Sequence, residues 1–306
     1  MLKSSNNLLF NNYFQLLTCS NMSLSDNAVC AATAVATTID IPAQPELLRL
    51  VQAELKKEEP DPRVISAAIL KDVAMSAALV RIANSAAFAG RRQIDSVTQA
   101  LAYIGLRQTT ALLTGLLLKN TPHFTGPQMP RFWDAATKRA VAMQYLARKT
   151  FVAEQDVAYT CGLFCDIGIA LMMRKFDTYP QTLMYANGAQ TEPFLQVEEF
   201  RHGTNHAVVG GMMARGWGLS DTVIQAIRIH HDYEAFNDAT VPEVVRELAA
   251  LLLLADRVVQ SFRGLNKTVE WEKGGAQGLT ALMMTNTQFD ELSDAVHELF
   301  ESDSTD

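Results

Sequence analysis

Apolar residues recur at three- and four-residue spacing through most of the chain after Ile41. This spacing places them on one face of an α-helix, whereas a half-buried strand alternates apolar and polar positions. Asp61-Pro62 has the form of a helix N-cap followed by proline at the first helical position. Ser96 and Gly105 mark the start and end of another helix. No segment alternates over a strand's length, so the sequence predicts an all-α fold.

The helical pattern has one clear interruption. Residues 120–130 contain three prolines and a glycine, which are typical of a connection between packed units. We therefore expect two helical subdomains, at 41–125 and 126–262, followed by C-terminal helices and an acidic tail at 263–306. Within the second subdomain, apolar periodicity predicts a single helix over 154–173.

Residues 1–40 differ in composition from the rest of the chain. They carry only three charged residues, and asparagines interrupt their apolar positions. A secretory signal would need a basic start and an unbroken apolar stretch of about 7–15 residues, and neither occurs. We expect a flexible N-terminal tail, in which Met22 is a candidate initiator because residues 1–21 match no helical or strand period.

Composition narrows the class of protein. With 48% apolar and 19% charged residues among 306, the chain is not intrinsically disordered. Its longest unbroken apolar run, residues 248–255, is far shorter than the about 20 residues that span a membrane. The net charge of −7 disfavours general binding to nucleic-acid phosphates. Four cysteines without a CxxC pair favour reduced thiols, so we expect a soluble cytoplasmic protein.

Histidine and aspartate residues supply the candidate chemistry. Four of the six histidines fall within 202–231, and His206 follows a helix start that directs it toward the interior. Asp166 and Asp256 both lie among apolar helical residues, where an unpaired charge would be very costly. Imidazoles, arginines or a metal ion could balance them. Two interpretations stay open: a metal site with nitrogen and oxygen ligands, or a hydrogen-bonded network inside the core.

A family resemblance adds to this picture. The segment Ile69–Phe88, ILKDVAMSAALVRIANSAAF, resembles the signature of the HDOD family, whose members are bacterial signalling domains related to the HD metal-dependent phosphohydrolases. Further matches, in the family's order, are Ile94, Ser96, Ala100, Ile104, Gly105, Leu106, Phe132-Trp133, Gly162 to Gly168, His206 with Gly210, Trp217-Gly218-Leu219, Ala226-Ile227 and His230-His231. The resemblance covers roughly 41–262 and implies a multi-helix HDOD/HD-like bundle.

The resemblance also implies which ligands an active HD site would need: a first histidine after the tryptophan, a His-Asp doublet and a late aspartate. Alignment on Trp133 puts Ala135 at the first position, and the doublet is Cys165-Asp166. Asp256 fits the late aspartate. With two of four ligands lost, we expect no catalytic residue, no metal and no cofactor.

The function implied is therefore that of a non-catalytic regulatory protein or scaffold in bacterial signal transduction. It would act through a protein partner, and a homodimer is left open. The alternative is a metal-dependent phosphohydrolase, with a divalent metal in a reduced or altered site. The residual ligands for that site are Asp166, His206, His230, His231, Asp256 and Cys165.

A second alternative is a nucleotide-sensing module without chemistry. Arg91, Arg92 and Arg107 flank Asn84-Ser85, and the guanidinium fork matches phosphate oxygens bidentately. A solvated basic rim is the simpler interpretation of these arginines. Asn84-Ser85 at a helix end fits capping, internal packing or docking of a partner.

Overall fold

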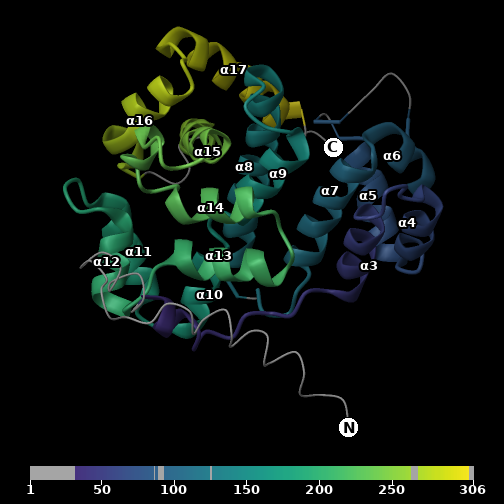
Figure 1. Ribbon diagram of the computed structural model, residues 1–306, viewed down its shortest axis with the longest axis horizontal. Helices are drawn as coiled ribbons and strands as arrows, with labels where there is room; N and C mark the ends of the chain where they lie inside the picture. The colour runs from purple at the N-terminus through teal and green to yellow at the C-terminus, as the bar shows by residue number, and fades with distance from the viewer. Residues whose placement is uncertain (1–31, 86, 89–92, 125, 263–267, 303–306) are drawn as a thin grey trace.

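The computed structural model describes residues 32–85, 87–88, 93–124, 126–262 and 268–302, and the regular structure of these residues is helical, with no β-strand among them (Figure 1). The all-α prediction is therefore confirmed. The helices are α3 (Glu46–Leu55), α4 (Pro62–Ile69), α5 (Val73–Ala83), α6 (Val97–Ile104), α7 (Leu106–Lys119), α8 (Met129–Thr150), α9 (Gln155–Phe164), α10 (Ile167–Lys175), α11 (Tyr179–Gly188), α12 (Phe194–His202), α13 (His206–Gly216), α14 (Asp221–Ile229), the 3-10 turn η1 (Ala235–Asn237), α15 (Glu243–Ser261), α16 (Glu270–Ala281) and α17 (Asn286–Ser302).

Local capping signals set several helix ends, as the sequence predicts. The Asp61 carboxylate accepts a hydrogen bond from a backbone N–H in the first turn of α4, and Pro62 is the first helical residue. Ser96 caps α6 in the same way. Gly105, with φ of +89°, ends α6 and lets the chain turn at once into α7. These contacts satisfy backbone groups that a helix end leaves without partners.

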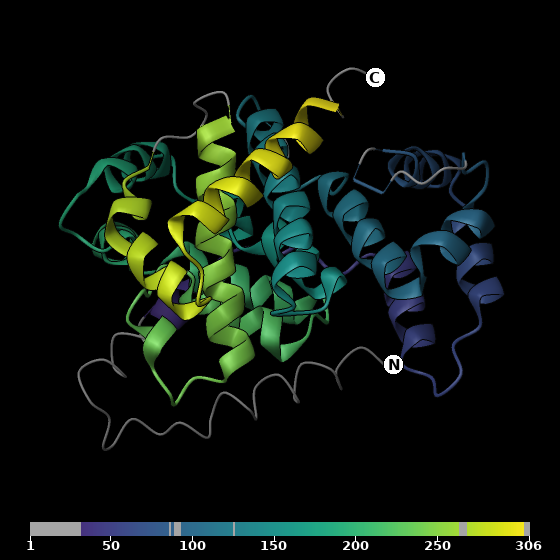
Figure 2. The same ribbon diagram turned by 90° about the horizontal axis from the view of Figure 1, so that it is seen from above.

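The helices form two groups that share one core. Helices α3–α7 lie together at one side, and α8–α17 make up the larger body (Figure 1, Figure 2). The connection between α7 and α8 coincides with the boundary expected near residue 125, yet one cluster of buried apolar side chains runs through both groups. Helix α7 packs against α9, where Gly115 permits the approach because an added methyl would lie 2.9 Å from Leu163.

The single helix expected over 154–173 was wrong. The chain forms two helices, α9 and α10, which are separated at Cys165-Asp166. After the break, α10 packs against α13 so closely that a methyl group on Gly168 would lie 2.0 Å from the carbonyl oxygen of His206. The periodicity of the sequence does not show this change of direction because both helices are buried and apolar on most sides.

One stretch of the described residues, Gln155–Lys175, is long and apolar enough to cross a membrane by length and composition alone. It consists of α9 and α10, and 72% of its apolar window is buried inside the protein. This stretch contains no long unbroken apolar run in the sequence, because Asp166 and other polar residues interrupt it. Because the stretch is mostly buried and is divided into two helices, it forms a pair of core helices.

Residues 32–40 also differ from expectation, because they pack on the body instead of belonging to a flexible tail. The side chains of Ala36 and Ile39 are buried, and Asp40 lies 3.2 Å from His123 and 3.3 Å from Arg174. The few charges of the N-terminal region gave no sign of these contacts. Residues 1–31, with Met22, lie outside the described residues.

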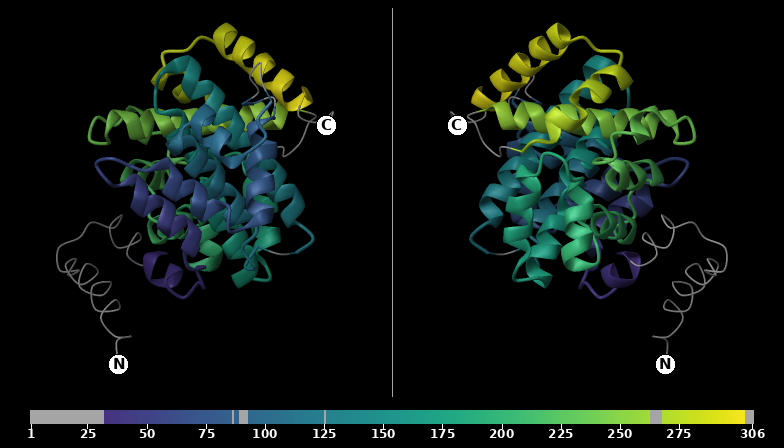
Figure 3. Two further views of the ribbon diagram at one scale, coloured as in Figure 1. Left: turned by 90° about the vertical axis from the view of Figure 1, so that its right-hand side faces the viewer. Right: turned by 90° about the vertical axis from the view of Figure 1, so that its left-hand side faces the viewer.

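The C-terminal helices complete the core. Helix α17 crosses α8 and α15 and buries Phe289, Val296 and Phe300 (Figure 3). Helix α16 packs along α15. Between α15, α8, α10 and α14 the interior becomes polar, and the candidate site lies there.

Candidate functional site

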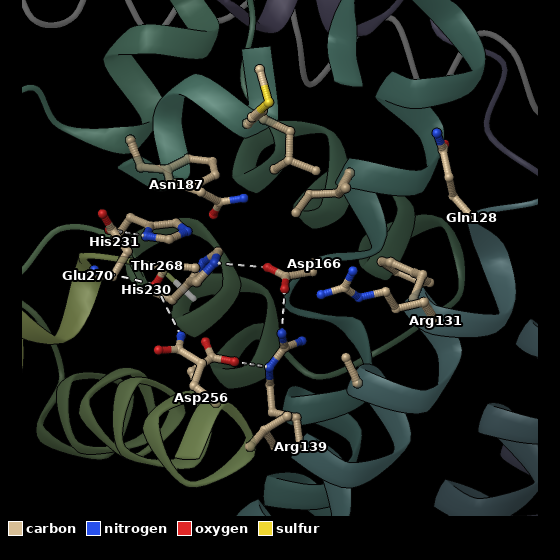
Figure 4. Close-up of a pocket in the computed structure, with 18 of the residues that line it drawn as sticks. Gln128, Arg131, Arg139, Asp166, Asn187, His230, His231, Asp256, Thr268 and Glu270 are labelled. Carbon is tan, nitrogen blue, oxygen red and sulfur yellow. Dashed lines mark hydrogen bonds and ion pairs between the residues drawn. The ribbon is translucent and has the colours of Figure 1, made fainter. Parts of the chain in front are cut away.

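A pocket of about 590 Å³ opens between α8, α10, α11, α14, α15 and the start of α16 (Figure 4). Apolar side chains such as Phe132, Leu183 and Leu253 form much of its wall. Its polar lining includes Arg139, Asp166, His230, His231, Asp256 and Glu270. The chain thus gathers four of the six residual ligand candidates in one pocket, with a buried arginine among them.

Arg139 is the centre of the polar floor. Its Nε donates to Asp256 Oδ1 at 2.5 Å, and one terminal nitrogen donates to Asp166 Oδ2, also at 2.5 Å (Figure 4). The other terminal nitrogen lies 3.0 Å from Cys165 Sγ. Residues from α8, the α9–α10 break and α15 therefore meet around one guanidinium, although Arg139 and Asp256 are 117 positions apart in the chain.

The electrostatics of this cluster follow from burial and from that shared cation. Burial opposes ionisation of Asp166, but Arg139 and the imidazoles of His230 and His206 hold the pKa of Asp166 well below its ordinary value. Burial and the neighbouring Asp166 raise the pKa of Asp256, and Arg139 offsets only part of this effect. Burial also raises the pKa of the Cys165 thiol well above its ordinary value. One arginine thus serves two carboxylates, and the thiol stays protonated.

Ala135 and Arg139 both face the pocket from α8. Ala135, the position expected from alignment on Trp133, lines the pocket one helical turn before Arg139. The side chain that reaches Cys165, Asp166 and Asp256 is Arg139 itself. Arg139 thus places a guanidinium between the residues that the resemblance aligns with the His-Asp doublet and the late aspartate, while Ala135 as the lost first-ligand position stays a prediction. The buried guanidinium repels any second positive charge in the space between Cys165, Asp166 and Asp256.

Beside the guanidinium, three imidazoles converge on the second oxygen of Asp166. Asp166, His206, His230 and His231 each offer one ligand atom, and these four atoms lie within 4.8 Å of one another. His206 Nε2 is 3.3 Å from His230 Nε2, and Asp166 Oδ1 is 3.7 and 3.5 Å from these two nitrogens. Two ligands about 2.05 Å from a tetrahedral ion lie about 3.3 Å apart. The separations among Asp166, His206 and His230 are close to this value, so these three residues are spaced as ligands of a divalent transition metal, with His231 within 4.8 Å.

The opposite nitrogen of each ring has an oxygen partner, which fixes the ring's orientation. Glu198 Oε2 lies 2.8 Å from His206 Nδ1, the carbonyl of Ile227 lies 2.6 Å from His230 Nδ1, and Glu270 Oε2 lies 2.8 Å from His231 Nδ1. Carboxylates and carbonyls accept hydrogen bonds, so each Nδ1 carries the hydrogen. In the neutral rings the Nε2 lone pairs are then available on the Asp166 side, as in metal-binding histidines.

The pKa values of His206 and His231 shift in opposite directions, although each ring is bonded to a carboxylate that favours its protonated form. Burial would lower the pKa of His206, but Glu198 and then Asp166 raise it above its ordinary value. His231 shows the opposite result: burial and the neighbouring His230 lower its pKa to about 4, despite its bond to Glu270. The pKa of Glu270 falls to about 2, since bonds to His231 and Lys273 outweigh burial. At neutral pH His231 is a neutral donor to an ionised carboxylate.

Comparison with known families identifies the fold. The HDOD domain model matches residues 41–233, which is more than half of the chain. The chain belongs to the HDOD family. An uncharacterized protein of Treponema pallidum (strain Nichols) is 25% identical over 252 residues, a match that covers 80% of this chain and 47% of that protein. The chain therefore spans about half the length of this curated relative.

Solved structures share the HDOD fold at low identity. A HDOD domain protein of unknown function from Geobacter sulfurreducens is 22% identical, with a TM-score of 0.66 over 89% of this chain and 99% of that one. A candidate phosphohydrolase from Shewanella amazonensis SB2B is 18% identical, with a TM-score of 0.68 over 89% and 95%. A candidate signal transduction protein from Marinobacter aquaeolei VT8 is 18% identical, with a TM-score of 0.59 over 98% and 66%. These likenesses show the fold alone.

Three residues of this HDOD site were not among the predicted ones: Arg139, Glu198 and Glu270. Arg139 lies on the apolar face of α8 that also carries Ala136 and Ala140, and a lone arginine on such a face was an available signal. Glu198 and Glu270 gave no comparable signal, because each lies in a helix with other charged residues. Their roles depend on contacts with residues distant in sequence.

The other predicted binding residues lie elsewhere. Asn84 caps α5, and its amide donates to the carbonyl of Ile94 at 2.7 Å and accepts from the backbone N–H of Ile94 at 2.8 Å. Asn84 has right-handed backbone angles, and these two bonds tie the end of α5 to the segment before α6. Arg107 is exposed in the first turn of α7. Arg91 and Arg92 lie outside the described residues, so nucleotide sensing through these arginines and Ser85 stays a prediction.

Proposed function

We propose that this HDOD protein is a non-catalytic regulatory protein that works in the cytoplasm, through contacts with a protein partner, in bacterial signal transduction. One observation carries the proposal: Arg139 occupies the space between Cys165, Asp166 and Asp256, where a catalytic HD site would hold its ion. The fold is similar to that of a candidate signal transduction protein from Marinobacter aquaeolei VT8, whose name agrees with the proposed role.

The physical argument concerns charge. The Arg139 side chain is 8% exposed, so its charge is not dispersed by water, and the two carboxylates that would bind an ion are already paired with it. An ion entering the same space would have to displace the guanidinium and leave it buried without a partner. The Cys165 thiol already contacts the guanidinium, and burial raises its pKa well above the ordinary value, so without an ion it adds no negative charge to this space.

Activity and metal measurements on the full chain test the proposal. The wild type and Asp166→Ala would be assayed with bis(p-nitrophenyl) phosphate and cyclic dinucleotides in the presence of Mg²⁺, Mn²⁺ or Zn²⁺. We expect no difference in turnover between the two proteins. Turnover in the wild type that Asp166→Ala abolishes would overturn the proposal.

A reverse design tests whether Arg139 is the cause. The double variant Arg139→His/Cys165→His restores the four ligand types of an HD site together with Asp166 and Asp256. We expect it to retain Mn²⁺ or Fe²⁺ through desalting in a 1:1 ratio beyond any metal the wild type retains. Arg148→His, at an exposed position of the same helix, is the matched control and should not change the metal content. Equal metal content in the wild type and the double variant would refute the role of Arg139.

A second candidate function is a metal-dependent phosphohydrolase with an altered site. The specific observation in its favour is the convergence of His206, His230 and His231 on Asp166. Those four residues would hold the ion, which when bound lowers the pKa of a water molecule and polarises a phosphoryl oxygen. Glu198 and Glu270 would hold the rings in place, and the apolar wall of the pocket would exclude water from the substrate.

Metal binding without hydrolysis separates the two candidates. A thermal-shift titration with Zn²⁺ and Co²⁺ would be compared between the wild type, His206→Gln and His230→Gln. Stabilisation that requires both histidines shows that the ion binds, and Asp166-dependent turnover would then be required for the enzyme. Stabilisation without turnover supports a regulatory protein that carries a cation, and absence of stabilisation removes the second candidate.

A further inference from the structure

We propose that Glu270, in the first turn of α16, is a positioning residue for His231 and couples cation binding in the pocket to docking of the C-terminal helices. The inference rests on the cation site formed by Asp166, His206, His230 and His231, the second candidate above. It adds a regulatory element to that site: the ring of His231 faces the pocket correctly only while α16 is in place.

The contacts of Glu270 carry the first step. Its side chain is 7% exposed, and Oε2 lies 2.8 Å from His231 Nδ1 and accepts a hydrogen bond from the hydroxyl of Tyr233. Its other oxygen accepts from Lys273 at 2.8 Å. Because Glu270 accepts the hydrogen of Nδ1, the Nε2 atom of His231 carries the lone pair. Figure 4 shows His231 and Glu270 among the residues that line the pocket.

The second step is that the start of α16 is itself held by the elements around the pocket. The backbone N–H of Val269 donates to the carbonyl of Asn187 at the end of α11, and Lys273 donates to the carbonyl of Glu192 in the α11–α12 connection. Gly274 lies directly on the ring of Tyr233, where an added methyl would be 2.5 Å from ring carbons. Undocking α16 therefore removes Glu270 from His231 and opens one side of the pocket.

The third step concerns where these residues lie in the chain. The match to the HDOD domain ends at residue 233, so α16 lies beyond it, and Glu270 is 37 positions after Tyr233. The segment that supplies His206, His230 and His231 does not supply the group that orients His231. Thermodynamic reciprocity then requires that a cation bound by the oriented ring also stabilises the docked state of α16.

Cobalt binding by the full chain tests the inference, with Co²⁺ absorption and competition against a chelator as the readouts. Removing a carboxylate that orients a ligating histidine weakens metal binding about 10–100-fold. We expect that loss in Glu270→Ala and substantial recovery in Glu270→Gln, whose amide oxygen still accepts from His231. Glu272→Ala removes an exposed carboxylate from the same helical turn and is the matched control. Gly274→Ala displaces α16 without altering Glu270, and it should weaken Co²⁺ binding in the same direction.

Amide exchange provides the readout that a purely structural role of Glu270 would not move. Co²⁺ should slow exchange across residues 270–281 in the wild type, and it should do so far less in Glu270→Ala. If wild type and Glu270→Ala bind Co²⁺ within twofold of each other, while circular dichroism shows both folded, the inference is overturned alone. If the wild type binds no Co²⁺, the cation site fails and the inference fails with it.

Discussion

Substitution of Arg139 by methionine removes the guanidinium that Asp166 and Asp256 share in the floor of the pocket. Methionine keeps an unbranched apolar stem but is shorter than arginine, so the change deletes the charge and hydrogen bonds of the guanidinium and part of its contacts. The carboxylate side chains are only 18% and 24% exposed, and they would be left close together without the guanidinium. Breaking a buried ion pair by removing one partner costs about 3–5 kcal/mol of stability. We expect a loss in this range at pH 7.

The loss should depend on pH, with a sign that follows from the orphaned carboxylates. In the variant, burial and mutual repulsion raise the pKa of both carboxyl groups above their unfolded values. Protonation then favours the folded state as pH falls, and each pH unit below a raised pKa recovers up to about 1.4 kcal/mol. In the wild type the pKa of Asp166 is instead depressed, so its stabilising contribution is lost only below about pH 4. The difference between the two proteins should therefore shrink from pH 7 to pH 5.

Urea unfolding followed by circular dichroism at pH 7 and pH 5 measures both effects. Arg148→Met, at an exposed position on the same helix, is the control and should stay within about 0.5 kcal/mol of the wild type. Adding Asp256→Asn to Arg139→Met should recover part of the loss, because it removes one of the unpaired charges. A loss below about 1 kcal/mol, or an equal loss at both pH values, would refute the view that Arg139 is the counter-charge of this site.

Three further predictions concern packing and titration. Gly168→Ala puts a methyl group 2.0 Å from the His206 carbonyl oxygen and should destabilise the protein by more than about 3 kcal/mol. Gly188→Ala is the control, because its added methyl group would have nothing within 4 Å. Comparable melting temperatures of the two variants would contradict the close contact of α10 and α13. Trp217→Phe deletes the buried indole N–H that donates to Pro42 and should cost about 2 kcal/mol in urea unfolding, and no measurable cost would argue against that bond. The pKa of His231 is about 4 in the folded protein against an ordinary 6.5, so the unfolded chain takes up this proton first and stability falls between pH 6.5 and 4. His231→Gln should flatten that fall by about 1–3 kcal/mol relative to the wild type, and an unchanged pH profile would exclude His231 as its source.

The sequence by itself determined the elements and the family. Helix starts at Asp61 and Ser96 and the turn at Gly105 depend on residues a few positions apart, so a local pattern is enough to predict them. The apolar spacing predicts helices and no strands, and the motifs around Asp166, His206 and His230 are sufficient for the resemblance to the HDOD family. Each of these features depends on residues that are close together in the sequence, so the sequence is enough to predict it.

Only the tertiary structure decided what fills the site. Alignment on Trp133 pointed to Ala135, but the residue of α8 that bonds Asp166 and Asp256 is Arg139, one helical turn later. Spacing in the sequence does not specify that turn, since both positions lie on the buried face of the helix. Likewise, Glu270 acquires its role because α16 docks beside His231. A buried charge is tolerated only where its partner lies at bonding distance, and that distance depends on how helices far apart in sequence pack together.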